Sequence, residues 1–219
     1  MTRAAPPGRI VARGRADYRA TLAAMRDFAE RRDHDTPDEI WWMEHPPVYT
    51  LGIAGRRHSL NNRGALPVIG TERGGEITYH GPGQLVVYPL LDLPRLGWRM
   101  RQLIEALEDV VLGIAGGIAR RDPVSPGVFV GDRKLASIGL RLRRGCTSHG
   151  IALNVCNDLS PFDDIAPCGR AGLRMTSLLR EGDGRCVATI ADLFTASLAA
   201  RLGWDTVPAG APQREVVFG

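Results

Sequence analysis

Cys168 is the residue of this sequence whose neighbours best suit chemical reactivity. It lies in "DDIAPCGRAG" (163–172), between a proline that fixes the incoming backbone and a glycine that lets a substrate approach closely. Most free cysteines are small buried hydrophobic residues, as we expect for Cys156 in the apolar run "IALNVCN". A thiol on a loop is more accessible. We therefore predict that Cys168 is a nucleophile, with Cys146 beside the basic run "RLRRG" as its rival.

A cysteine nucleophile needs a nearby cation, because the thiolate is the reactive form and an unperturbed thiol has a pKa near ~8.5. Lys134 is one candidate, since it is the only lysine among the 28 Lys and Arg residues. Arginine cannot release a proton in a protein, whereas lysine is a compact ammonium whose pKa can be lowered. The lone lysine indicates a position where arginine fails, although chance also leaves one lysine anywhere in a chain.

An imidazolium is the alternative cation. His80 in "TYHGPGQ" and His149 in "SHGIALN" are both flanked by glycine. Each of them is also typical of a histidine that bonds backbone at a strand end. His34, His45 and His58 lie in polar or proline-rich contexts and suggest less.

Metal and phosphate chemistry find little support in the sequence. The four cysteines are dispersed, without a C-x-x-C pair or zinc-ligand spacing, so we expect reduced thiols and no metal. The stretch "RGGEITYHGPGQ" (73–84) lacks the patterns of a phosphate loop and of a dinucleotide fingerprint. Its glycines suggest a backbone wall around an extended ligand, or only a tight turn.

Hydrophobic periodicity predicts the elements that must position these residues. It indicates helices over 17–32 and from Leu103 to Ile114, and a third helix opened by a capping box of Thr189 and Asp192 that runs to about residue 201. Strands are expected at 10–13, on either side of Pro46-Pro47, at 85–90, in a hairpin about Gly131-Asp132 whose second strand carries Lys134, and in "HGIALNV".

Hairpins outnumber β-α-β units in this pattern. The fold class is therefore α/β (α+β), with a mixed, largely antiparallel sheet flanked by helices. No repeat or long linker divides the chain, so we expect residues 1–219 to form a single catalytic domain.

Composition narrows the possible partners and compartment. With 44% hydrophobic and 24% charged residues and no apolar run near ~20 residues, the chain is typical of a soluble globular protein without a membrane span. The first residues have no apolar signal core, which favours a cytoplasmic location. The net charge of +4 is not gathered into a long basic run, so we expect no nucleic acid, and an acidic protein partner stays open.

Five stretches, in order along the chain, resemble the lipoyl(octanoyl) transferases, also called lipoate-protein ligase B. Together they span residues 44 to 178. They are "EHPPVYTLG" (44–52), "RGGEITYHGPGQLVVYPLLDL" (73–93), "GDRKLASIG" (131–139), "TSHGIALNV" (147–155) and "PCG" followed by "TSL" (167–169, 176–178).

The resemblance implies the fold shared by biotin and lipoate protein ligases. It implies transfer of octanoyl from octanoyl-acyl carrier protein to a lysine on lipoyl domains, those of 2-oxoacid dehydrogenase complexes and the glycine cleavage H protein. No cofactor is implied. Exchange of thioesters is nearly neutral in energy and amide formation is downhill, so no ATP is required.

The resemblance also implies roles for individual residues. Cys168 would carry the acyl-thioester and Lys134 would lower its pKa. Apart from the resemblance, backbone N–H groups of 137–139 or Gly169 are candidates for holding the oxyanion. Phe129 stands in "GVFV" where tryptophan is expected. The matching substrate-binding segments, which would line an acyl tunnel shaped by two histidines, comprise Arg73, Gly74, Gly75, Glu76, Ile77, Thr78, Tyr79, His80, Ser137, Ile138, Gly139, His149, Gly150, Ile151 and Ala152.

Further expectations and alternatives remain open. Arg141, Arg143 and Arg144 are candidates for docking the acidic carrier protein.

An ATP-dependent lipoate or biotin ligase would need no cysteine, and ATP dependence would distinguish it. A catalytically silent carrier-binding module would fail to acylate. A cysteine hydrolase using Cys168 with a histidine would release free acid.

Overall fold

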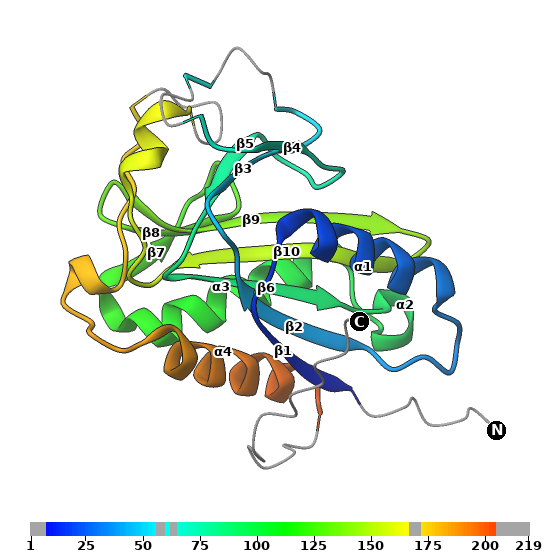
Figure 1. The fold of residues 1–219 in the computed structure, drawn as a ribbon. Helices are drawn as coiled ribbons and strands as arrows, with labels where there is room; N and C mark the ends of the chain where they lie inside the picture. Colours follow the sequence, from blue (N-terminus) through cyan, green and yellow to red (C-terminus); the bar gives the residue numbers. More distant parts are fainter. Residues whose placement is uncertain (1–7, 56–59, 62–64, 167–171, 205–219) are drawn as a thin grey trace.

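The centre of the molecule is a seven-stranded sheet with helices on both faces and a smaller three-stranded sheet beside it (Figure 1). The computed structural model describes residues 8–55, 60–61, 65–166 and 172–204. The large sheet has the order β1-β2-β6-β10-β9-β8-β7, comprising Arg9–Arg15, Glu39–Glu44, Gln84–Leu90, Cys146–Asn154, Arg133–Arg143, Gly127–Val130 and Ala119–Arg121. The small sheet has the order β4-β3-β5, comprising Val68–Gly70, Val48–Leu51 and Ile77–His80.

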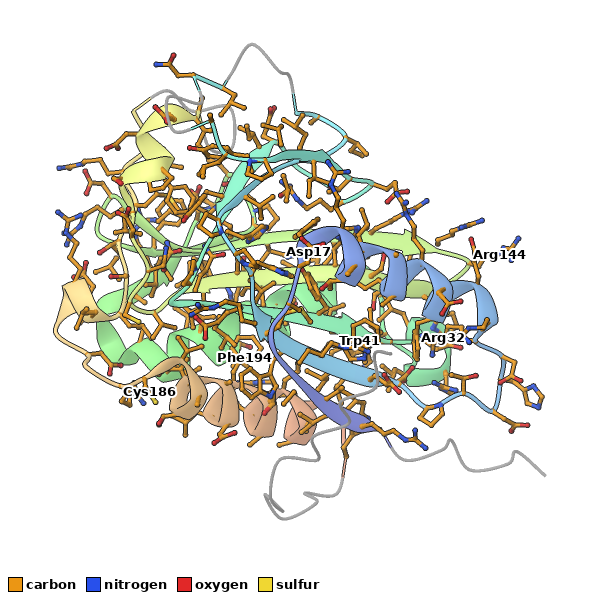
Figure 2. All side chains as sticks on the ribbon, viewed as in Figure 1. Asp17, Arg32, Trp41, Arg144, Cys186 and Phe194 are labelled. Carbon is orange, nitrogen blue, oxygen red and sulfur yellow. The ribbon has the colours of Figure 1, made fainter. Side chains whose placement is uncertain are left out.

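Only β1 with β2 and β3 with β4 pair in parallel among the described strands, so the predicted mixed, largely antiparallel sheet is confirmed. Helices α3 and α4 cover one face of the large sheet and α1 covers the other (Figure 1). Phe194 of α4 is fully buried in the apolar core that lies between the large sheet and helices α3 and α4 (Figure 2). The helices are α1 Tyr18–Arg31, α2 Leu93–Leu96, α3 Met100–Ala115 and α4 Val187–Arg201, with short 3-10 turns at Gly116–Ile118, Ser160–Asp164 and Leu179–Glu181.

The first two long helices lie where the sequence predicts them, but the start of α4 differs. Asp17 caps α1 by accepting a hydrogen bond from the backbone N–H of Ala20 at 2.9 Å. The predicted capping box of Thr189 is wrong, because α4 begins at Val187 and no side chain caps it. Val187, Ile190 and further apolar residues at helical spacing are buried, so packing starts the helix two residues earlier.

The segment that the sequence assigns to a turn, residues 73–84, contains strand β5. Its residues pair with β3 in antiparallel register, from Val48 opposite His80 to Leu51 opposite Ile77. Ile77 and Tyr79 alternate into a small apolar core of their own. Four residues between glycines are too few for a period of two to stand out, which is why the sequence alone does not reveal this strand.

A β-bulge in β9 decides where Lys134 lies. The register between β8 and β9 shifts by one residue between Val128–Ala136 and Phe129–Lys134, which leaves Leu135 as an extra residue. Leu135 and Ala136 both pack in the core under α3 and α4. Strict alternation would place Lys134 on the same side as Ala136, and the extra residue turns it to the opposite face.

Asp38 is a buried ionic junction between α1, β2 and α2. Its Oδ1 accepts hydrogen bonds from Arg32 at 2.7 Å, from Arg95 at 2.6 Å and from the backbone N–H of Asp92 at 2.8 Å. The side chains of Asp38 and Arg32 are 5% and 4% exposed, and Arg32 lies at the end of α1 (Figure 2). Removal of one partner therefore leaves an uncompensated charge in the interior.

We predict that Asp38→Ala lowers the free energy of unfolding by about 3–5 kcal/mol, measured by urea denaturation. The matched control is Asp27→Ala, which removes an ion pair with Arg31 on the exposed face of α1. Such surface pairs contribute about 0.3–0.5 kcal/mol. Equal losses of unfolding free energy in the two variants would show that burial does not make the ion pairs of Asp38 more important for stability.

Candidate active site

Lys134 is a buried cation at one end of β9. Its residue is 1% exposed, and its Nζ donates a hydrogen bond to the carbonyl oxygen of Pro126 at 3.3 Å. The same Nζ lies 5.5 Å from the ring centroid of Phe129, within the range of a cation–π contact. The side chain passes so close to Gly127 that a Cβ there would lie 2.7 Å from Lys134 Cε. The strand β8 is therefore shaped around this lysine.

The chain that follows Cys168 is bonded to the backbone of Lys134. The N–H of Lys134 donates to the carbonyl of Arg174 and the N–H of Thr176 donates to the carbonyl of Lys134, both at 2.9 Å. Arg174 is six residues after Cys168 in the sequence. Cys168 itself, and Gly169 beside it, lie outside the described residues.

A chain of buried hydrogen bonds fixes this segment to three strands. Asn154 Nδ2 donates to the carbonyl of Thr176 at 2.9 Å, and its Oδ1 accepts from Gln84 Nε2 at 2.9 Å. Gln84 Oε1 lies 2.8 Å from His80 Nδ1. Because the amide nitrogen of Gln84 is the donor to Asn154, its oxygen must accept, and His80 carries its proton on Nδ1.

A narrow cavity of about 60 Å³ begins at Lys134 and lies between the small sheet, α1 and the large sheet. Thirteen of the fifteen predicted substrate-binding residues line it; Gly74 and Tyr79 do not. Tyr79 packs in the small-sheet core instead, because it alternates away from its neighbours Thr78 and His80. The sequence missed three further lining residues, which come from α1 and β6: Tyr18, Val86 and Tyr88.

Arg73 holds the segment after β4 over the cavity. Its Nη2 donates to the carbonyl of Thr50 at 2.7 Å and to the Thr50 hydroxyl at 2.9 Å, and its Nη1 donates to the carbonyl of Gly74 at 3.0 Å. The backbone N–H of Gly74 in turn donates to the carbonyl of Leu140 on β9 at 2.9 Å. The predicted backbone wall is thus tied to both sheets.

Two buried histidines, His80 and His149, line the cavity, and a third, His45, packs against His80. Burial lowers the pKa of each. The pKa is about 3 for His80 and about 4 for His45 and His149. Neutral imidazole also fits the bonds of His45, whose Nδ1 lies 2.7 Å from the carbonyl of Ala16 and whose Nε2 lies 2.9 Å from the Tyr88 hydroxyl. Burial therefore favours the neutral imidazole over the imidazolium at all three positions. The lowered pKa values disfavour the alternative of an activating imidazolium at His80 or His149.

His45 is the buried polar residue that sequence reasoning passed over. It is fully buried, and its ring centroid lies 5.0 Å from that of Tyr18 and 5.8 Å from that of His80. Its neighbours Pro46-Pro47 suggested a loop, yet it directly follows β2. Of the other two histidines, His34 is exposed and His58 lies outside the described residues.

The remaining cysteines differ from their expected roles. Burial raises the pKa of Cys146, although Arg32 and Arg95 lie nearby, so the predicted activation of this rival by cations is wrong. Cys156 is exposed rather than buried, because β10 ends two residues before it. Cys186 is exposed before α4, and a hydrogen bond with Thr189 lowers its pKa.

The arginines expected to dock a carrier protein lie at the opposite end of β9 from Lys134. Figure 2 shows Arg144 at the hairpin turn between β9 and β10. Counted along β9 with the bulged Leu135 left out, six steps separate Lys134 from Arg141, which corresponds to about 20 Å. A carrier bound at these arginines would have to deliver its acyl group over that distance.

Neither a metal site nor a membrane span occurs in the described part of the chain. No group of His, Cys, Asp or Glu side chains there is arranged to hold a metal ion. None of the helices in the described ranges combines the length and the apolar character of a membrane span.

The fold and the sequence are similar to those of known proteins of one class. Residues 17–200 match the family model of the lipoyl protein ligase A/B catalytic domain. The structure is similar to lipoate-protein ligase A bound with ATP, with a TM-score of 0.74, 14% identity and coverage of 93% of this chain and 90% of that one. At this identity the likeness concerns the fold, and it confirms the expected lipoate-ligase-like fold.

Two curated relatives are more similar to this chain in sequence. The octanoyltransferase of Alkalilimnicola ehrlichii is 54% identical over 174 residues, which are 77% of this chain and 80% of that protein. The octanoyltransferase of Chromohalobacter salexigens is 46% identical over 217 residues, which are 94% of this chain and 98% of that protein. This chain therefore belongs to the octanoyltransferases within the lipoyl protein ligase A/B catalytic domain family.

The three buried histidines predict how stability depends on pH. Their folded pKa values of about 3 to 4 lie below the unfolded value of 6.5, so the unfolded chain binds protons first as the pH falls. We expect the free energy of unfolding to be fully present above pH 6.5. It should fall between pH 6.5 and 4 by up to about 1.4 kcal/mol per pH unit for each histidine.

Urea denaturation across this pH range measures the slope. His45→Gln should reduce it by about one histidine's share, whereas His34→Gln, which changes an exposed side chain, should leave it unchanged. A slope that is the same in His45→Gln and in the unsubstituted protein would show that His45 does not stay neutral in the folded state.

Proposed function

We propose that this protein transfers octanoyl from octanoyl-acyl carrier protein to a lysine of lipoyl domains, the first step of protein lipoylation, through an acyl-thioester on Cys168. The observation that carries the proposal is Lys134, the only lysine of the chain, buried at the end of a cavity and bonded through its backbone to the segment that follows Cys168. Membership of the octanoyltransferases supports the acyl group.

In the first step the ammonium of Lys134 stabilises the thiolate of Cys168, which attacks the carbonyl carbon of the donor thioester. The new bond joins that carbon to the Cys168 sulfur, and the bond to the carrier sulfur breaks. Lys134 gives its proton to the departing thiolate. Backbone N–H groups of 137–139 or Gly169 hold the negative charge on the carbonyl oxygen while it exists.

In the second step the amine of the acceptor lysine attacks the Cys168 thioester. A C–N bond forms, the C–S bond breaks, and the neutral amine of Lys134 accepts the proton that the attacking amine loses. The pair of residues returns to its starting state, with no ATP consumed and no cofactor required. Neutral histidines in the cavity wall leave Lys134 without a competing imidazolium.

The octanoyl chain would occupy the cavity that begins at Lys134. Its walls combine small residues of β9 and β10 with apolar residues of β5 and β6, among them Gly139, Ala152, Ile77 and Val86. The acceptors would be the lipoyl domains of 2-oxoacid dehydrogenase complexes and the glycine cleavage H protein. The whole chain would act as one catalytic domain.

The acyl-enzyme is the direct test of this proposal. Mixed with octanoyl-acyl carrier protein and no acceptor or ATP, the protein should gain the mass of one octanoyl group in intact-protein mass spectrometry. Hydroxylamine should remove it, and peptide mapping should place it on Cys168. Addition of a lipoyl domain should move the octanoyl group to the acceptor.

Variants of the other thiols are the controls. Cys146→Ser and Cys186→Ser should retain the label, and Cys168→Ser should lose it. A label on Cys186, or an active protein that never carries one, would contradict the assignment of the nucleophile. Transfer that depends on ATP and free octanoate would favour the ligase alternative, and release of free octanoate without an acceptor would favour a hydrolase.

A further inference from the structure

Two cavities of this molecule meet at one residue, His149. The cavity that begins at Lys134 includes His149 in its wall. A second cavity of about 250 Å³, beneath α1, also includes His149. The β10 residues of the first cavity are Ala152, Ile151, Gly150 and His149, and those of the second are His149, Ser148, Thr147 and Cys146. Along the strand, one cavity ends where the other begins.

The register of the strands gives the separation along β9 between Lys134 and the residue opposite His149. His149 lies opposite Leu140 on β9, and Gly150 lies opposite Gly139. Counted along β9 with the bulged Leu135 left out, five steps separate Lys134 from Leu140, which corresponds to about 16 Å. The lysine side chain and an acyl chain of medium length would together fill this distance.

The backbone of His149 is held in an unusual conformation that turns its side chain into the cavities. Its φ is +59°, a left-handed value that residues other than glycine rarely adopt and that packing must maintain. The register of β10 with β6 pairs Ile151 with Val87, and its continuation places His149 opposite Pro89, which has no N–H to donate. The ladder is distorted at this point.

Strand alternation shows what the distortion does. Ile151 and Leu153 pack in the core under α3 and α4, and a period of two would place His149 there as well. Instead its ring lies on the α1 side, edge-on to Tyr88 with ring centroids 6.4 Å apart. Like the bulge that turns Lys134, this irregularity brings one side chain to the cavity face of the sheet.

The Nδ1 atom of His149 has no hydrogen-bond partner among the described residues. The residue is 2% exposed, and the Nδ1 atom itself is buried. A buried polar atom usually has a partner. The position is therefore held by backbone geometry and ring packing rather than by hydrogen bonds of the Nδ1 atom, which suits a residue that closes off a space.

The cavity beyond His149 is a poor environment for a hydrocarbon chain. Arg26 donates to Glu72 at 2.6 Å, and Arg141 lies 3.5 Å from the other oxygen of Glu72. Arg143 and Arg144 line the same space. A methylene that entered it would displace water from charged groups without replacing their hydrogen bonds.

We propose that His149 is the end wall of the acyl cavity and sets the longest acyl chain that the protein accepts. The proposal rests on the proposed octanoyl transfer and adds to it a residue that determines specificity. Chains of about eight carbons would end against the imidazole ring, and longer chains would require the ring to move into the charged cavity.

His149→Gly tests the proposal, because glycine keeps the left-handed backbone without strain and removes the whole ring. His149→Asn, which also tolerates this backbone, removes part of it. Ser148→Ala, one residue away and lining only the second cavity, is the matched control. Octanoyl- and dodecanoyl-acyl carrier protein are offered to each protein with a lipoyl domain, and binding of octanoate and dodecanoate is measured by calorimetry.

The expected result is a rise of about tenfold or more in the ratio of dodecanoyl to octanoyl transfer in His149→Gly, with a smaller rise in His149→Asn and none in Ser148→Ala. Each methylene that becomes buried in the space vacated by the imidazole ring is worth a factor of roughly four in affinity, so two such methylenes already exceed this value without any gain from the charged cavity beyond. The ratio of the two fatty-acid affinities should shift in the same direction.

An unchanged ratio in a His149→Gly protein that still transfers octanoyl would overturn the inference and leave the proposed function standing. Suppose that His149→Gly shifts the ratio of dodecanoate to octanoate affinity, but that neither it nor the unsubstituted protein transfers octanoyl. That result would overturn the proposed reaction and support the role of His149 as the end wall. An unsubstituted protein that prefers dodecanoyl to octanoyl would also overturn the inference.

Discussion

One extra residue in β9 determines on which face of the sheet the only lysine of the chain lies. Without the bulge at Leu135, alternation would direct Lys134 into the apolar core beneath α3 and α4, where the desolvation of an ammonium is costly. With it, the ammonium reaches the carbonyl of Pro126 and the face of Phe129. The site thus depends on a local break in strand pairing. It also depends on Gly127, because a larger residue there would collide with the side chain of Lys134.

The polar residues around the cavity other than Lys134 are held in structural contacts. Burial keeps the three histidines neutral. Arg73 is a cation, but arginine does not release its proton. The guanidinium of Arg73 instead donates hydrogen bonds to Thr50 and holds the segment after β4 in place. Buried hydrogen bonds through Asn154 and Gln84 position the segment that follows Cys168. Each of these polar groups therefore positions backbone or shapes the cavity, which is consistent with the proposed roles of Cys168 and Lys134.

Much of this arrangement follows from the sequence, and the remainder depends on tertiary contacts. Long periodic segments such as 17–32, and the hairpin about Gly131-Asp132, are confirmed because local patterns specify them. The rarity of lysine singles out Lys134 from composition alone. The bulge at Leu135 and the left-handed backbone of His149 have no local signature, since each arises from the partner strand. His45 was missed because its proline neighbours suggest a loop and only the fold surrounds it with aromatic rings.

The claim at the centre of this account is that Lys134 exchanges protons and is more than a positive charge. The measurement that tests it most directly is the rate of octanoyl transfer by Lys134→Arg, set beside the pH dependence of Cys168 alkylation by iodoacetamide in the same variant. Arginine can retain part of the electrostatic stabilisation of the thiolate, but it neither gives nor takes a proton. We predict that alkylation persists while transfer falls by at least ~100-fold, the lower end of what positioned proton transfer contributes. Transfer by Lys134→Arg at near the unsubstituted rate would show that charge alone suffices, and would contradict the account.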